Sequence, residues 1–111
     1  MPKVPNIDRA IIAPAKLTHY LLALTHPRGA SKARFFIGFG FRAGRPHELA
    51  SALLEQAQTH DYVDLQQHSE GTKYAVSGPL RCPDGRSPHV RTIWIIDIGR
   101  SEPRLVTAFP D

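Results

Sequence analysis

The residues best suited to chemistry lie in one short stretch, HPRGASKARFF, which runs from His26 to Phe36. Histidine titrates near neutral pH, so His26 could accept or deliver a proton. Lys32 falls at the expected start of a helix, where its ammonium and the unpaired backbone N–H groups would together suit a phosphate. Arg28 and Arg34 add two more cations. The stretch predicts an anion-binding site, and the alternative is a turn followed by a solvated basic helix face.

The positive charge of the chain is regional. The net charge is +4, from 14 Lys and Arg against 10 Asp and Glu, a modest excess that occurs in many proteins without a polyanionic partner. Its distribution is more informative, because residues 26–46 contain no Asp or Glu. The basic residues of that segment are Arg28, Lys32, Arg34, Arg42 and Arg45.

Several common kinds of site are poorly supported. The six histidines show neither H-E-x-x-H nor H-x-H spacing, so we expect no metal site, and the sequence indicates no cofactor. The stretch GFGFRAG lacks the spacing of a dinucleotide-binding loop, and Cys82, the single cysteine, has no partner for a disulfide. RNA cleavage remains, because attack by the 2′-hydroxyl requires only a base, an acid and cations around the phosphorane.

A second set of polar residues lies in the predicted strands. By alternation, Thr72 and Tyr74 share one face of a strand and Lys73 takes the other, and Arg91 and Thr92 likewise face opposite ways. A guanidinium among isoleucines, as at Arg91, requires a carboxylate, a ligand or access to solvent. Tyr74 could stack on a base or pack in the core.

The elements that must position these residues can be read from the hydrophobic patterning. Helical spacing predicts helices over 14–24 and 46–58, and a short helix capped by Ser31 with Ala33, Phe36 and Ile37 on its buried face. Alternating and β-branched stretches separated by Gly and Pro predict strands over 61–67, 71–80, 89–97 and 104–109.

This order predicts an α+β fold, with two to three N-terminal helices packed on a four-stranded antiparallel meander sheet. We expect a single domain over 1–111, with an extended arm over 1–12, a helical part over 13–60 and the sheet over 61–110. The sequence has neither the pattern of a signal peptide nor an apolar run long enough to span a bilayer, so a cytoplasmic protein without a membrane partner is expected.

Three stretches of the chain resemble a small bacterial domain of unknown function that occurs alone and as the C-terminal tail of polymorphic toxins. They are KLTHYLLALTHPRGASKARFF, GTKYAVSGPL with PDGRSPHVRTIWIIDIG, and PRLVTAFP, and the similarity covers roughly residues 12–110. The order of elements is similar to that of the metal-independent ribonuclease superfamily of barnase, EndoU, colicin tRNases and RelE-like toxins, which is a fold-level analogy.

The resemblance implies a toxin-like ribonuclease that acts on tRNA, mRNA or rRNA and is held in check by an antitoxin or immunity protein. It implies proton transfer by His26, stabilisation of the phosphorane by Lys32 and Arg91, and positioning of the phosphate by Thr107 or Thr72. The catalytic set expected is His26, Lys32, Arg91 and Thr107. The substrate-binding set expected is Arg28, Arg34, Thr72, Lys73, Tyr74 and Thr92.

Two other functions stay open at this stage. A non-catalytic RNA-binding module would keep the basic face without the chemistry, and a neutralising partner protein would act through an exposed sheet edge or apolar patch. Because no long delivery region precedes the domain in this sequence, a standalone intracellular toxin or a non-catalytic relative is expected.

Overall fold

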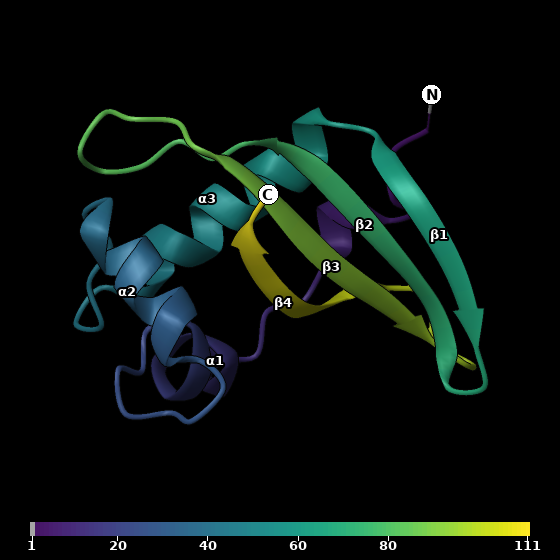
Figure 1. Cartoon of the computed structure of the whole chain (residues 1–111). Helices are drawn as coiled ribbons and strands as arrows, with labels where there is room; N and C mark the ends of the chain where they lie inside the picture. Colours follow the sequence, from purple (N-terminus) through teal and green to yellow (C-terminus); the bar gives the residue numbers. More distant parts are fainter. Residues whose placement is uncertain (1) are drawn as a thin grey trace.

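The computed structural model describes residues 2–111, which form helices followed by a sheet (Figure 1). The helical part comprises the 3₁₀ turn η1 (Ile7–Arg9), α1 (Pro14–Lys16), the π-helical turn η2 (Leu17–Leu21), α2 (Ala30–Gly38) and α3 (Pro46–Thr59). The strands are β1 (Tyr62–His68), β2 (Gly71–Pro79), β3 (His89–Asp97) and β4 (Arg104–Pro110). All strand pairs are antiparallel in the order β1-β2-β3-β4. The predicted α+β fold with its meander is confirmed.

One face of the sheet packs against α3 and carries the core. Val76 of β2 and Trp94 of β3 are fully buried there, together with Leu53 of α3. Because side chains alternate along a strand, Lys73 and Arg91 lie on the opposite face, which we call the outer face. The helices gather at one end of the sheet, and the β1–β2 hairpin extends away from them (Figure 1).

A buried polar network joins α3 to the sheet. Gln56 is 1% exposed and donates from Nε2 to the carbonyls of Val76 and Val90, at 3.2 and 2.8 Å. Its Oε1 accepts from the hydroxyl of Thr92 at 2.9 Å, and that hydroxyl accepts from the indole N–H of Trp94 at 2.9 Å. Each buried polar group therefore has a partner, which removes the penalty for placing them in the core.

The first helix departs from the prediction of a regular helix over 14–24. After one α-helical turn the chain widens into the π turn η2, in which the N–H of Leu22 donates to the carbonyl of Leu17 at 2.8 Å. The wider turn places Leu17, Leu21 and Leu22 in the core and leaves Leu24 55% exposed. The extra residue in the turn shifts the helical register, so Tyr20 is only partly buried and lies at the sheet edge.

The start and the buried face of α2 also differ from the prediction. The helix is capped at Gly29, so Ser31 lies inside the first turn rather than at the N-cap. Ala33 and Phe36 are buried as expected, whereas Ile37, predicted on the same buried face, is 37% exposed.

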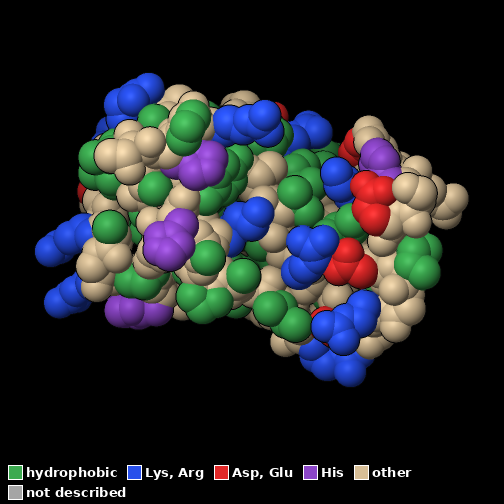
Figure 2. Space-filling view, turned by 90° about the horizontal axis from the view of Figure 1, so that it is seen from below, with side chains coloured by type: hydrophobic (Ala, Val, Ile, Leu, Met, Phe, Trp, Pro, Cys, Tyr) green, Lys and Arg blue, Asp and Glu red, His purple; other side chains and the backbone are tan. Residues whose placement is uncertain are grey.

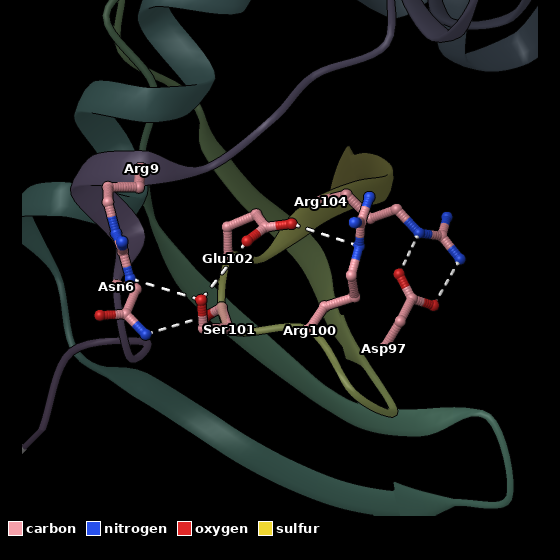
Figure 3. Close-up of polar contacts among 7 residues, drawn as sticks. All are labelled: Asn6, Arg9, Asp97, Arg100, Ser101, Glu102 and Arg104. Carbon is pink, nitrogen blue, oxygen red and sulfur yellow. Dashed lines mark hydrogen bonds and ion pairs between the residues drawn. The ribbon is translucent and has the colours of Figure 1, made fainter.

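The N-terminal segment is tied along the sheet rather than loosely extended. Val4 and Ile7 are buried, and Ile11 forms a parallel bridge with Arg104 at the β4 edge. Figure 3 shows the polar contacts near the β3–β4 turn, where the side-chain amide of Asn6 donates to the Ser101 carbonyl at 2.8 Å. These contacts determine where the chain enters α1, beside β4.

Candidate functional site

A cavity of about 560 Å³ lies between the edge of β4, the α1–η2 segment and the loop that precedes α2. The residues that line it are Ala13, Ala15, Lys16, Tyr20, His26, Arg28, Val106 and Thr107. Three of them, Lys16, His26 and Arg28, are basic residues, and none of these described lining residues is an Asp or Glu. We call this space the Tyr20 cavity, and its composition suits an anion.

Tyr20 is the centre of the polar contacts in this cavity. Its hydroxyl shares a hydrogen bond with the Thr107 hydroxyl at 3.2 Å, and its ring lies edge-on to the His26 ring at a centroid distance of 5.0 Å. The ammonium groups of Lys16 and Lys32 lie 5.3 and 5.5 Å from the ring centroid. Burial raises the pKa of Tyr20, but the hydrogen bond with Thr107 and the two ammonium charges outweigh burial, so this pKa lies below the usual tyrosine value.

His26 is oriented by the backbone of the HPRG turn. Its Nδ1 accepts from the N–H groups of Arg28 and Gly29, at 3.0 and 2.9 Å. Because Nδ1 is an acceptor, the proton of the neutral ring is on Nε2, which can donate to a ligand. His26 therefore bonds the local backbone, as a turn residue does, and also lines the cavity.

Gly29 allows the HPRG turn to close against the π turn. A Cβ at this position would lie 2.5 Å from the carbonyl oxygen of Tyr20 and 2.9 Å from its ring. Only glycine fits this contact, which brings His26 and Lys32 to Tyr20 although the residues belong to different turns of the chain.

Arg91 lies in a different cavity from His26. It lines a space of about 220 Å³ on the outer face of the sheet and is not one of the described residues that line the Tyr20 cavity. Its Nε pairs with Asp111 at 3.5 Å, while Asp97 pairs with Arg104 at 2.7 Å (Figure 3). The structure therefore does not bring Arg91 to His26, although the resemblance implies that both act on one phosphate: Arg91 faces outward from the middle of the sheet, and His26 lies beyond its edge.

The other predicted substrate-binding residues are dispersed. Lys73 and Tyr74 line the outer-face cavity together with Arg91, and the buried ring of Tyr74 lies edge-on to Tyr62 at 5.0 Å. Thr92 is fully buried and bonded within the Gln56 network. Thr72 is partly buried at the start of β2, near the β1–β2 turn, and Arg34 is exposed on α2.

Sequence reasoning missed Tyr20 and Lys16 as site residues. The apolar spacing of the first helix assigned Tyr20 to its packed face, and the π turn that changes this has no signal in the hydrophobic pattern. Thr107 was found only through the family resemblance.

Charge on the molecular surface differs between the helical end of the molecule and the end that carries the β3–β4 turn. Figure 2 shows the face seen from below, where Lys, Arg and His side chains gather over the helical end. Acidic side chains are more evident at the other end, beside cations. Around the β3–β4 turn, Arg104 pairs with Asp97, and Arg100 pairs with Glu102 at 3.3 Å. The basic charge near the Tyr20 cavity is thus less neutralised than the charge near this turn.

Within residues 2–111, no group of three or more His, Cys, Asp or Glu side chains is arranged to hold a metal ion. In the same part of the chain, no helix has the length and hydropathy needed to cross a membrane.

The fold and the cavity define a small α+β domain with an antiparallel meander and a basic cleft at one sheet edge. The chain belongs to the DUF6883 family, a domain of unknown function whose profile matches residues 3–111. The fold is similar to that of a chain in the contact-dependent growth inhibition toxin–immunity protein complex from Klebsiella pneumoniae 342, with a TM-score of 0.67 and 14% sequence identity. The match covers 91% of this chain and 99% of that chain. No curated protein matches the sequence significantly.

Proposed function

We propose that this protein is a toxin-like, metal-independent endoribonuclease that cleaves RNA through attack of the 2′-hydroxyl on the adjacent phosphate. The observation that carries the proposal is the meeting of Tyr20, Thr107, His26 and Lys16 in one cavity, with the ammonium of Lys32 5.5 Å from the centroid of the Tyr20 ring. A phosphate in this cavity would find cations and hydrogen-bond donors and no lining carboxylate to repel it.

The residues divide the work of such a reaction. The two lysines favour the phenolate form of Tyr20. This phenolate takes the proton of the 2′-hydroxyl while the 2′-oxygen forms its bond to phosphorus. The bond from phosphorus to the 5′-oxygen then breaks, and an ammonium of Lys16 or Lys32 supplies the proton to that oxygen. The products are a 2′,3′-cyclic phosphate and a 5′-hydroxyl.

His26 and Thr107 hold the phosphate during this step. The orientation of His26 makes Nε2 a donor to a phosphoryl oxygen rather than a base. Arg28 adds a cation at the rim of the cavity, and the hydroxyl of Thr107 positions both Tyr20 and the phosphate.

A neutralising protein is part of the proposal. The structural neighbour belongs to a complex of a toxin with its immunity protein, and the basic cavity of this chain fits the toxin partner better than the neutralising one. A partner that presents carboxylates to the Tyr20 cavity would exclude RNA by charge and by volume.

A non-catalytic RNA-binding module is the second candidate. It is favoured by the engagement of His26 Nδ1 with two backbone N–H groups, which is the arrangement of an ordinary turn residue. Such a module would bind RNA with strong salt dependence and leave it intact.

Incubation of the purified protein with total RNA in EDTA tests the proposal. We expect cleavage with 2′,3′-cyclic phosphate ends, slowed but still measurable in Lys32→Ala and unchanged in Arg34→Ala. Arg34 lies on the same helix at an exposed position and is not among the described residues that line the Tyr20 cavity. Growth inhibition on expression should follow the same pattern. Intact RNA at every protein concentration would overturn the enzyme, and salt-sensitive binding without cleavage would establish the second candidate.

A further inference from the structure

The outer-face cavity adjoins the Tyr20 cavity through β4. Thr107 lines the Tyr20 cavity and Phe109 lines the outer-face cavity. Two residues apart on one strand, they lie about 7 Å apart along it and on the same face. Their register confirms the shared face, since Thr107 pairs with Ile93 and Phe109 with Arg91, two positions that alternate together on β3. The separation is within the reach of one nucleotide.

The lining of the outer-face cavity combines apolar surface with hydrogen-bonding groups. Phe109 and Ile93 supply the apolar part. The polar part comes from β1, where the amide of Gln66 donates to Oδ2 of Asp64 at 3.1 Å, which leaves the amide carbonyl and the carboxylate as acceptors. At about 220 Å³ the cavity is smaller than the roughly 300 Å³ or more of drug-sized sites, so it suits a single ring system.

Two cations complete this cavity. Lys73 lies opposite Gln66 in the β1–β2 pair. The side chain of Arg91 is positioned by its ion pair with Asp111. Since a planar aromatic surface, hydrogen-bond acceptors and cations lie together, the lining matches the three parts of a nucleotide: the face of the base, its polar edge and its phosphate.

We propose that the outer-face cavity binds the nucleobase next to the scissile phosphate. The inference rests on the proposed ribonuclease function and specifies how its substrate lies: the phosphate at Tyr20, the strand along β4, and the base against Phe109. Because Asp64 accepts hydrogen bonds, the cavity prefers bases with an amino group, adenine, cytosine and guanine, over uracil. In this arrangement Arg91 binds the substrate by contacting the phosphate that follows this base along the strand.

Binding of uncleavable dinucleotides tests this inference. The probes carry a 2′-deoxy sugar on the 5′ side of the phosphate, with each base varied in turn, and inorganic phosphate serves as the probe for the Tyr20 cavity alone. Affinities are measured by titration followed with NMR. We expect dinucleotides to bind more tightly than phosphate, with shifts in β1 and β4, and the amino-bearing bases to bind best.

Two variants locate the base. Phe109→Ala should weaken dinucleotide binding roughly tenfold or more, the loss of one stacked base, without changing phosphate binding. Asp64→Asn, at an exposed position of β1, should reduce the preference for amino-bearing bases. Val63→Ala, an exposed neighbour that is not among the described lining residues, is the matched control.

The outcomes separate the two proposals. Equal affinity for phosphate and dinucleotides, together with RNA cleavage, would overturn the base site and leave the ribonuclease standing. Binding unchanged by both Phe109→Ala and Asp64→Asn would overturn the base site as well. Failure of every probe to bind, together with intact RNA, would overturn both proposals.

Discussion

Replacement of Tyr20 by phenylalanine removes a single oxygen from the centre of the proposed site. The ring stays, so its edge-on contact with His26 and the nearby ammonium groups of Lys16 and Lys32 are retained. What is lost is the hydroxyl and its 3.2 Å hydrogen bond with Thr107. The variant therefore separates the chemistry of Tyr20 from its packing.

The expected magnitudes of the two losses differ. A partly buried neutral hydrogen bond contributes about 0.5–1.5 kcal/mol to the free energy of unfolding. A loss of 1 kcal/mol lowers the melting temperature by roughly 4–8 °C in a small domain, and a protein with about 5 kcal/mol of stability remains almost entirely folded at 25 °C. Loss of a proton-transfer group lowers the rate by about 10²–10⁴-fold. The loss of folding stability in Tyr20→Phe is therefore too small to account for such a drop in the cleavage rate.

The assay measures cleavage of a short RNA in EDTA at 25 °C, with thermal unfolding of the same samples. Tyr62→Phe is the matched control, because the Tyr62 ring also lies edge-on to an aromatic neighbour but is not among the described residues that line either cavity. We expect Tyr62→Phe to cleave at the wild-type rate.

The pH profile adds a second measurement. If the Tyr20 phenolate is the base, the wild-type rate rises with pH and levels off below the usual tyrosine value of about 10. Lys32→Ala removes a charge that favours the phenolate, so the midpoint should move to higher pH. A Tyr20→Phe enzyme within threefold of the wild-type rate, or an unmoved midpoint in Lys32→Ala, would show that Tyr20 transfers no proton.

Three further predictions concern stability and reactivity. Gln56→Leu should cost about 2–4 kcal/mol of unfolding free energy in urea, because it keeps the side-chain volume but leaves the Thr92 hydroxyl and buried carbonyls without their partner. Burial raises the pKa of the Cys82 thiol to about 11, so alkylation at pH 8 should be about 100-fold slower than that of a free thiol. The hydrogen bond from Arg104 holds the pKa of Asp97 below its usual value. This pair therefore stabilises the fold above about pH 4, and its contribution is lost as the pH falls through the lowered pKa. Urea unfolding midpoints measured across this pH range would show the loss.

Each of these has its own control. Ser51→Ala, at an exposed position of α3, should change the unfolding free energy by less than about 0.5 kcal/mol. A Gln56→Leu variant as stable as the wild type would show that the Gln56 network does not stabilise the core. Cys82 should react at the ordinary thiol rate in urea; fast reaction of the folded protein would contradict its burial. Arg104→Gln should reduce the acid-dependent loss of stability, and an unchanged profile would count against the pair.

Local patterning in the sequence was sufficient for the architecture. The β-branched run of β3, the turns at 83–85 and 99–103 and the periodicity of α3 each depend on residues close in the chain, so they predicted the meander and α3 nearly to the residue. The basic segment around His26 and Lys32 was visible for the same reason, because charge and residue type need no tertiary information.

The arrangement of the site depends on contacts between distant parts of the chain. Tyr20 meets Thr107 across 87 positions, and it does so only because the π turn shifts its register and Gly29 admits the HPRG turn. Arg91 could be seen to need a partner, but the partner is Asp111 rather than a ligand beside His26. A strand pattern shows that two faces exist, whereas only the packing of α3 on one of them establishes which side chains are buried and which can meet a substrate.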